Sequence, residues 1–539
     1  MLTFDGSGLY SDGGTTTIAA ANIAFANSQA TPNSTGANTG GAGGSLIVDT
    51  TGTVSFGAGV KTFFGFGETS FIAGQQILFT GSGSLDAKSA NVILAAPALI
   101  ANGGSTQALT TTGGLTIEQG AGTAPALVPA NIGGSLTLTA AGIIDSGAIV
   151  AQAGTVVLDA TSGDVIVDST ASIRATGSEI SLFDTVEEAP GGFVRLISAG
   201  NVSIADGATI DVSGTGNGFA GSLGIQAAGT ATLGGTLRGS AFYADMGGQF
   251  ALTAGNLAGN LPFDGAFTSS FAVSLQQGDI SIATGQTLTS SNVLLVTNSG
   301  SIMVDGTIDA SGPSAGTIQL FGAGTDDTSG VTINSGAQLL ARYQAGSPND
   351  PVSGGGAKSQ NGGTIVLGTA GTPDGTVNPN YGYENVDASG RITVAAGAIL
   401  DASGGAEGSG GLVQLRAPIL TDNSANVVFN GAVRGAGTVA LNAYATWSTT
   451  DSSTGVKHFD GIIDPAGWFG NDGTALAGTD QNGFPVNAPT PQNPLGTGQV
   501  FTPNTPNADH TGFYQNTLVN FVESFAPSNA GSLGGIELR

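Results

Sequence analysis

Apolar and polar residues alternate in short segments along most of the chain. Within 200–214, Val202 and Ile204 share one face of the first segment, and Ile210 and Val212 share one face of the next. An alternation with a period of two over a few residues is typical of a half-buried strand. Gly, Asp, Asn and Ser separate the segments and favour turns. The pattern therefore predicts many short strands and little helix.

The alternating segments recur as a repeat. The clearest copies read G-N-V-S-I-A-D-G-A-T-I-D-V-S-G at 200–214, G-S-I-M-V-D-G-T-I-D-A-S-G at 300–312 and G-R-I-T-V-A-A-G-A-I-L-D-A-S-G at 390–404. A second element consists of two small residues and a short apolar strand that ends in Leu, as in G-G-F-V-R-L at 191–196 and G-G-L-V-Q-L at 410–415. Units this short bury a core only by stacking on their neighbours, which is the property of a solenoid.

We therefore expect an all-β chain that folds as a right-handed parallel β-helix. Coils of about 20–30 residues would stack at about 4.8 Å. A β-propeller is less favoured, because its blades of about 40–50 residues need a more regular spacing. The predicted rod spans 1–441 with a loop insertion at 237–271, and 442–539 is expected to be an irregular region rich in Pro, Asn, Thr and aromatic residues. Within that region, 505–525 is the best candidate for a helix or a covering strand.

Composition narrows the functional classes. The 539 residues include 91 Gly and no Cys, and 12 basic against 38 acidic residues give a net charge of −26. A hydrophobic share of 40% excludes a disordered chain, which lacks apolar residues to bury. Nucleic-acid binding needs a basic surface, which a chain of this negative charge lacks. A helical membrane span needs about 20 apolar residues in a row, and the sequence contains no such run. We therefore expect no nucleic-acid partner and no membrane insertion.

Candidate catalytic residues are few. His458 and His510 both fall in the C-terminal region, and no G-x-S-x-G motif stands between a strand and a helix. Asp184, Glu187 and Glu188 form the one dense acidic group beside an aromatic residue. A glycan-cleaving lyase or hydrolase would need such carboxylates in a groove, whereas the favoured interpretation is a solvated loop. We therefore expect no catalytic residues and no enzymatic activity, with the glycan-cleaving enzyme as the alternative.

Metal and cofactor sites are not predicted either. The chain has no EF-hand loop and no G-G-x-G-x-D-x-U-x nonapeptide, the two calcium-binding patterns that its Gly-rich repeats bring to mind. Asp326 and Asp327 could share a cation with nearby carbonyl groups, but a surface turn is the favoured interpretation. The absence of Cys removes thiolate metal sites.

Aromatic residues are the predicted ligand contacts. Trp447 and Trp468, the only two Trp residues, lie close to Tyr444 in the sequence, and Tyr243 lies in the predicted insertion. Aromatic rings with a polar group are typical binding anchors, whereas a regular face of Ser, Thr and Asn offers little pocket. We predict that any ligand contacts these four residues. The alternative is that the rings are buried covers over the edges of the coils.

The order of these elements resembles the filamentous-haemagglutinin family of large bacterial exoproteins, the passengers of two-partner secretion. The resemblance rests on G-T-I-D-A-S-G and the G-G-x-V-x-L strands, on G-G-Q-F-A-L-T-A-G-N-L at 247–257 and on V-S-L-Q-Q-G-D-I-S-I at 273–282, and it is best over 133–441. It implies a β-helix, export through an outer-membrane secretion pore, and an extracellular or bacterial cell-surface location. It also implies adhesive or structural work, with a host-cell surface, a glycan or other copies of the protein as partners.

The ends of the chain depart from that family. The first residues contain no export signal, and N-P-N occurs at 378–380 rather than near the start, where the family's secretion domain carries N-P-N-G or N-P-N-L. We therefore expect an internal or C-terminal piece of a longer protein. A self-assembling extracellular fibre subunit remains a further alternative.

Overall fold

The computed structural model describes most of the chain up to residue 445 and short segments beyond it. The described residues are 1–30, 43–123, 131–263, 266–324, 329–346, 359–370, 373–377, 384–386, 390–418, 420, 425–445, 462–463, 499–500, 519–525 and 536–538. Their elements are strands, apart from one short 3-10 helix at Ala244–Met246. The chain forms two compact units, 1–276 and 277–539.

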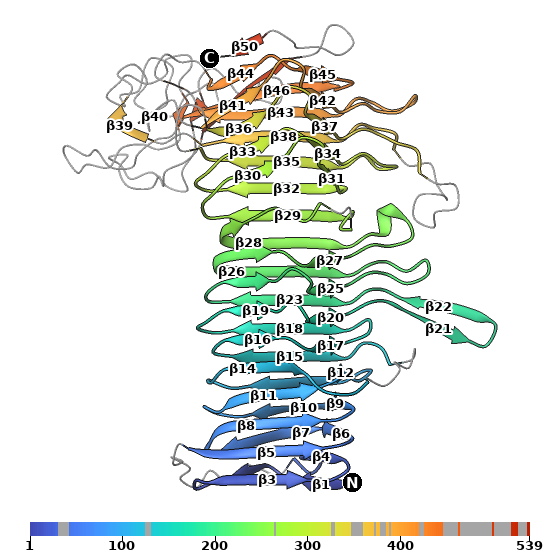
Figure 1. Cartoon of the computed structure of the whole chain (residues 1–539). Coiled ribbons are helices and arrows are strands. Elements are labelled where there is room, and N and C mark those ends of the chain that lie inside the picture. The colour runs from blue at the N-terminus through green and yellow to red at the C-terminus, as the bar shows by residue number, and fades with distance from the viewer. Residues whose placement is uncertain are drawn as a thin grey trace, which may run out of the picture. The chain divides into compact units, whose positions relative to one another are not determined.

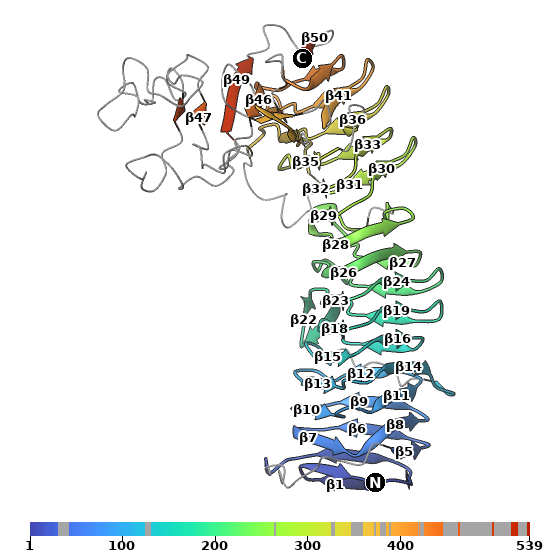
Figure 2. The same cartoon turned by 90° about the vertical axis from the view of Figure 1, so that its left-hand side faces the viewer.

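The N-terminal unit is a stack of coils that supply strands to three parallel ladders (Figures 1 and 2). The first ladder contains, in order of pairing, β2 (Gly8–Tyr10), β7 (Gly59–Phe64), β10 (Ser82–Asp86), β13 (Thr106–Thr110), β15 (Ser135–Ala140), β18 (Thr155–Ala160), β23 (Phe193–Ser198), β26 (Ser222–Leu233), β28 (Gln249–Ala258) and β29 (Ser270–Leu275).

Within each coil, the chain passes from the first ladder to the second and then to the third. The second contains β3 (Thr15–Ala19), β5 (Gly44–Thr50), β8 (Phe66–Ala73), β11 (Asn91–Ala96), β14 (Leu115–Gln119), β16 (Ile143–Asp145), β19 (Val165–Val167), β24 (Val202–Ile204) and the second halves of β26 and β28. The third contains β1 (Leu2–Asp5), β4 (Ile23–Ala26), β6 (Thr53–Phe56), β9 (Gln76–Phe79), β12 (Leu99–Ala101), β17 (Ala148–Val150), β20 (Ser172–Arg174), β25 (Thr209–Asp211) and β27 (Thr236–Arg238).

The stacking is in register, so each inward position forms a column of like side chains. One column of the first ladder consists of the buried residues Val156, Val194, Leu223, Phe250 and Phe271. Because alternate residues of a strand point to opposite sides, the residues between them face outward. The period-two alternation of the sequence is therefore the alternation between core and surface of the coil.

The C-terminal unit repeats the arrangement of three ladders. Its first ladder contains β32 (Asn292–Thr297), β35 (Thr317–Gly322), β38 (Thr364–Thr369), β43 (Leu412–Pro418) and β46 (Thr438–Ala445). Its second contains β30 (Ile280–Ile282), β33 (Ile302–Val304), β36 (Gly330–Ile333), β41 (Arg391–Val394) and β44 (Val427–Phe429). Its third contains β31 (Thr287–Thr289), β34 (Thr307–Asp309), β37 (Gln338–Leu340), β42 (Ile399–Asp401) and β45 (Ala432–Arg434).

A few strands depart from the parallel stacking. In the N-terminal unit β21 (Ser178–Leu182) and β22 (Thr185–Ala189) form an antiparallel hairpin. In the C-terminal unit β39 (Pro373–Val377) pairs with β40 (Glu384–Val386), and β47 (Ile462–Ile463) pairs with β48 (Gln499–Val500). There, β49 (Val519–Phe525) also lies antiparallel along β46, and β50 (Ile536–Leu538) lies antiparallel along β44.

These observations confirm the all-β parallel β-helix and correct one part of the expected domain plan. Residues 237–271 are not an insertion as a whole, because β28 lies in register between β26 and β29. Phe250 and Phe271 belong to an inward column, so aromatic residues replace Val and Leu in the core there. Beyond the predicted boundary at 441, β46 continues to Ala445 and β49 supplies the expected covering strand, while the rest of 442–539 lies largely outside the described residues.

Candidate functional site

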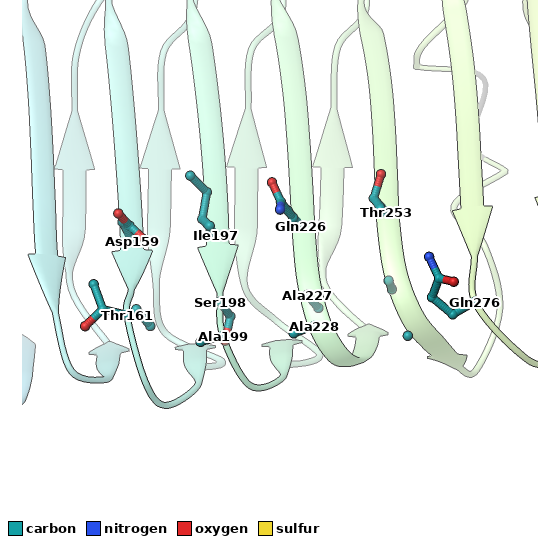
Figure 3. A pocket seen from close by; sticks show the side chains of 13 residues that line it. Asp159, Thr161, Ile197, Ser198, Ala199, Gln226, Ala227, Ala228, Thr253 and Gln276 are labelled. Carbon is teal, nitrogen blue, oxygen red and sulfur yellow. The ribbon is translucent and has the colours of Figure 1, made fainter.

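The N-terminal unit carries a groove of about 470 Å³ at the bend between its first and second ladders. It crosses β18, β23, β26 and β28 and reaches the residue after β29, so it runs from coil to coil (Figure 3). Two rows of residues line it, and we call it the corner groove. The strand row consists of the outward-facing residues Asp159, Ile197, Gln226 and Thr253, which are register partners in neighbouring strands.

The corner row lies at the bend itself. It consists of Thr161, Ala199, Ala228, Gly255 and Gln276. Three consecutive coils thus place a methyl group or no side chain at the bend, and longer polar side chains stand at both ends of the row. The floor between the rows is formed by buried small residues of the strands. The corner groove therefore results from small side chains aligned over successive coils.

The bend has a local structural reason in the sequence. In the coils of β26 and β28 one long strand continues from the first ladder into the second, and the pairing shifts between Ala227 and Thr230. A β-bulge of this kind bends the strand. A Cβ atom on Gly255 would lie 2.6 Å from the carbonyl oxygen of Ala228, so this position needs a glycine. The backbones of the two coils therefore come close together beneath the corner groove.

The polar groups of the corner groove are mainly amides and hydroxyls. Gln226, Thr253, Thr161 and Gln276 are exposed, and the Thr161 hydroxyl donates a hydrogen bond to the carbonyl oxygen of Ala140 at 3.0 Å. The Arg195 guanidinium on β23 donates a hydrogen bond to Oε1 of Gln226, with the nitrogen and oxygen 3.4 Å apart. Asp159 supplies the only carboxylate among the lining residues.

The predicted acidic group lies elsewhere, on the hairpin of β21 and β22. Asp184 and Glu187 are exposed and Glu188 is half-buried. Glu188 stands opposite Glu179 in the antiparallel register, and its Oε1 accepts a hydrogen bond from the backbone N–H of Asn217 at 3.0 Å. This hairpin projects from the coils (Figure 1). The three predicted acids thus belong to a solvated projection, whereas the corner groove is lined by none of them.

Tyr243 is the predicted ligand contact whose surroundings the structure describes. It lies just before the 3-10 helix, half-buried, and its ring meets that of Phe242 edge-on with the ring centres 4.8 Å apart. Phe242 is 74% exposed. Tyr444 lies in β46, but its side chain is outside the described residues, as are Trp447, Trp468, His458, His510, Asp326 and Asp327. The ligand contacts therefore stay a prediction.

Two ionisable side chains are buried in inward columns of the N-terminal unit. Lys61 aligns with Leu85, is 1% exposed, and donates hydrogen bonds from Nζ to the carbonyl oxygens of Gly57 and Gly59, each at 2.6 Å. Its removal from water lowers the pKa of the Lys61 ammonium to about 8. The two carbonyl groups belong to a residue of the turn before β7 and to the first residue of β7, so this lysine satisfies backbone acceptors inside the coil.

Asp145 aligns in register with Ile117 in the preceding coil and with Val167 in the following coil, so it stands where those coils have an apolar side chain. Its Oδ1 accepts a hydrogen bond from the backbone N–H of Gly147 at 3.0 Å, while Oδ2 has no partner among the described residues. Burial raises the pKa of the Asp145 carboxyl to about 7; the Gly147 amide opposes this shift and the charge of Asp168 adds to it. Both buried groups are enclosed in the core and are separate from the corner groove.

Searches for similar proteins found no matching family model, no matching curated protein and no matching solved structure. Within the described part of the chain, no group of three or more His, Cys, Asp or Glu residues is placed to hold a metal ion. No helix among the described residues is long and apolar enough to cross a membrane.

Sequence reasoning missed the corner groove, although the sequence contains a signal for it. Aligned by register, three consecutive repeats carry S-A at 198–199, A-A at 227–228 and A-G at 254–255, where the first ladder gives way to the second. Small residues at the same place in successive repeats mark a shallow strip along a solenoid. That signal becomes visible only when the repeats are aligned by the register of their strands.

Proposed function

We propose that the chain is a non-catalytic β-helical part of a secreted or cell-surface protein and does adhesive or structural work. The observation that carries the proposal is the in-register stacking of three parallel ladders in each unit. Such a stack presents the same kinds of outward side chains from coil to coil over an extended surface. Extended repetitive surfaces suit contact with another surface better than they suit the enclosed chemistry of an enzyme.

Charge and composition agree with this proposal. A net charge of −26 favours solubility and opposes non-specific contact with nucleic acids or anionic membranes. Secretion through an outer-membrane pore and display at a bacterial surface follow from the family resemblance of the repeats. Under this proposal a host-cell surface, a glycan or further copies of the protein are the partners.

Localisation and adhesion test this proposal. Antibodies against the chain, applied to intact cells that produce it, should label the cell surface or detect the protein in the medium. The fluorescently labelled full chain should bind to cells in a saturable way. Recovery of the protein only from the cell interior, together with no cell binding, would overturn the proposal.

The glycan-cleaving alternative receives no specific support from the described residues. Its candidate carboxylates, Asp184, Glu187 and Glu188, lie on the projecting hairpin. A reducing-end assay on polysaccharides with the full chain would expose such an activity. Release of reducing ends that is lost in Glu187→Gln or Glu188→Gln would replace the adhesive proposal with the enzymatic one.

A further inference from the structure

We propose that the corner groove binds an unbranched, uncharged polysaccharide chain that lies along the stacking direction of the coils. The inference rests on the proposed function and deepens it, since it names the class of ligand that an adhesive β-helix would hold. The direction follows from the two rows of lining residues, each of which takes one residue from each successive coil (Figure 3).

The spacing of the groups suits a polymer with a short repeat. Neighbouring strands lie about 4.8 Å apart, so each row presents one side chain at about that interval. One sugar unit of an unbranched chain has a comparable length. A saccharide chain in the corner groove would therefore bring hydroxyl groups past Asp159, Gln226 and Thr253 in turn.

The chemistry of the lining suits hydroxyl groups. Gln226 and Thr253 pair with groups that both donate and accept hydrogen bonds, and the Thr161 hydroxyl, which donates to the carbonyl oxygen of Ala140 at 3.0 Å, accepts a further one. The bond from Arg195 occupies Oε1 of Gln226 and leaves the amide protons of Nε2 for an acceptor on the ligand. Asp159 is the charged acceptor of the set, and hydrogen bonds to an ionised acceptor are the stronger ones.

The corner row supplies room and apolar contact. Ala199, Ala228 and Gly255 keep the bend free of long side chains over three coils. The methyl groups of the two alanines can pack against the C–H groups of a sugar ring. Thr161 and Gln276 close the row at its two ends, which limits the site to a short stretch of polymer.

An extended peptide is a poorer fit to the same place. Peptides that add to a sheet pair with the free edge of a strand. Here β18, β23, β26 and β28 each have a parallel partner on both sides, so the sheet beneath the corner groove offers no free edge. A ligand must bind through outward side chains, which matches a hydroxyl-rich chain.

Anionic polymers are a poorer fit on electrostatic grounds. No Lys or Arg lines the corner groove, and the Arg195 guanidinium beside it is already bound to Oε1 of Gln226. Asp159 together with the net charge of −26 repels phosphate, sulfate and carboxylate groups. Aromatic ligands lack a stacking partner, because no aromatic ring lines the corner groove. Uncharged saccharides thus remain the class that the lining favours.

Titration of the full chain with defined oligosaccharides tests the inference. Cellohexaose, chitohexaose, xylohexaose and mannohexaose are added separately, and binding is followed by calorimetry. We expect at least one of them to bind with a micromolar to millimolar dissociation constant. Ala228→Trp places a large ring in the middle of the corner row and should weaken that binding at least tenfold. Asp159→Asn and Gln226→Ala remove one polar contact each and should weaken it about three- to tenfold.

The matched control is Ala141→Trp. Ala141 is the residue after β15, and Thr161 is the residue after β18, the strand paired with β15. Ala141 therefore holds the same place at the bend as Thr161, but Ala141 does not line the corner groove. This variant should bind the oligosaccharide as the unmodified chain does. Gln226 is exposed, so Gln226→Ala keeps the test decisive even where Ala228→Trp lowers the melting temperature.

The outcomes separate this inference from the proposed function. No binding of any of the four hexasaccharides, or binding that Ala228→Trp and Gln226→Ala leave unchanged, would overturn the inference. Binding of a heparin hexasaccharide alone would also overturn it, because the ligand would then be anionic. The adhesive proposal is judged on the unmodified chain: it stands if that chain is found at the cell surface or in the medium and binds cells, even when no hexasaccharide binds. It fails if the chain is found only inside cells and does not bind cells, even when a hexasaccharide binds.

Discussion

Oδ1 of Asn201 accepts a hydrogen bond from the backbone N–H of Thr230, with nitrogen and oxygen 2.8 Å apart, and thereby joins one coil of the N-terminal unit to the next. One coil earlier, Oδ1 of Asp164 accepts from the backbone N–H of Asn201 at 2.7 Å. Asn91 makes the same link to the N–H of Gly114 at 2.9 Å. The Asn and Asp residues that precede or begin the second-ladder strands therefore satisfy backbone donors where the chain bends.

Replacement of Asn201 tests these links. Asn201→Ala removes the acceptor for Thr230 and the bond of 3.2 Å from Nδ2 to Asp164. We expect a loss of about 1 kcal/mol of stability, seen in calorimetry as a lower melting temperature. Ser203→Ala changes an outward residue of β24, the strand that begins directly after Asn201, and should leave the melting temperature nearly unchanged. Equal melting temperatures for the two variants would contradict a stabilising role of the links.

The recurrent G-G or A-G pair before many first-ladder strands has a steric cause. A Cβ atom on Gly192 would overlap the carbonyl oxygen of Gly154, and one on Gly221 would overlap that of Gly192. These glycines form a column in which consecutive backbones approach too closely for a side chain. Gly224, two residues into β26, differs, since a Cβ atom there would meet only Cγ of Arg195 at 3.8 Å.

Substitution by alanine should separate the two kinds of glycine. Gly192→Ala forces neighbouring coils apart and is expected to destabilise the N-terminal unit by about 3 kcal/mol or more. Gly224→Ala should be neutral or stabilising by about 0.5–1 kcal/mol, because alanine loses less conformational entropy in a strand. Melting temperatures of the two variants check this, and a destabilised Gly224→Ala with an unaffected Gly192→Ala would reverse the argument.

Local sequence predicts the coil well and predicts the surface of the stack poorly. The alternation places Val202, Ile204, Ile210 and Val212 inward, and all four are fully buried. The prediction of buried positions succeeds because successive residues of a strand point to opposite faces, so the alternation in the sequence alone determines which residues share a face. Which residues become neighbours on the surface depends on the register between coils. That register pairs residues that are far apart in the sequence, so local patterns do not reveal it.

Phe250 and Ala228 illustrate what the register decides. The aromatic residues around Phe250 interrupt the small-residue motif and therefore favoured a loop insertion, yet Phe250 stacks on Leu223 in the core. Ala228 looks like any exposed alanine in the sequence. It contributes to the corner groove because Ala199 and Gly255 fall at the same place in the coils on either side.

Lys61 should resist chemical modification in the folded chain. Its side chain is 1% exposed and bound to two carbonyl groups, whereas the Lys88 side chain is 48% exposed. An amine-reactive ester should therefore modify Lys88 rapidly and Lys61 only after unfolding, although the lowered pKa of Lys61 would favour reaction if the amine were accessible. Peptide mass spectrometry of native and urea-unfolded samples measures both sites. Equal native modification of the two lysines would show that this part of the coil opens readily.

Asp145 should make the stability of the N-terminal unit depend on pH. Burial raises the pKa of its carboxyl from 3.8 to about 7 in the folded chain. Between these values the folded state holds a proton that the unfolded state has lost, so stability from this group falls as pH rises and the loss is complete above about pH 7. At 1.36 kcal/mol for each pKa unit, the loss is about 4 kcal/mol.

Asp145→Asn removes this titration and keeps an oxygen to accept from the N–H of Gly147. The unmodified chain should therefore melt at a lower temperature at pH 8 than at pH 5, and the difference should shrink in Asp145→Asn. Asp49→Asn, which changes an exposed carboxylate on β5, is the control and should keep the difference of the unmodified chain. Asp145→Val restores the side-chain class of Val167 in the next coil and should raise the melting temperature most at pH 8. A pH difference that persists in both Asp145 variants would assign the effect to other groups.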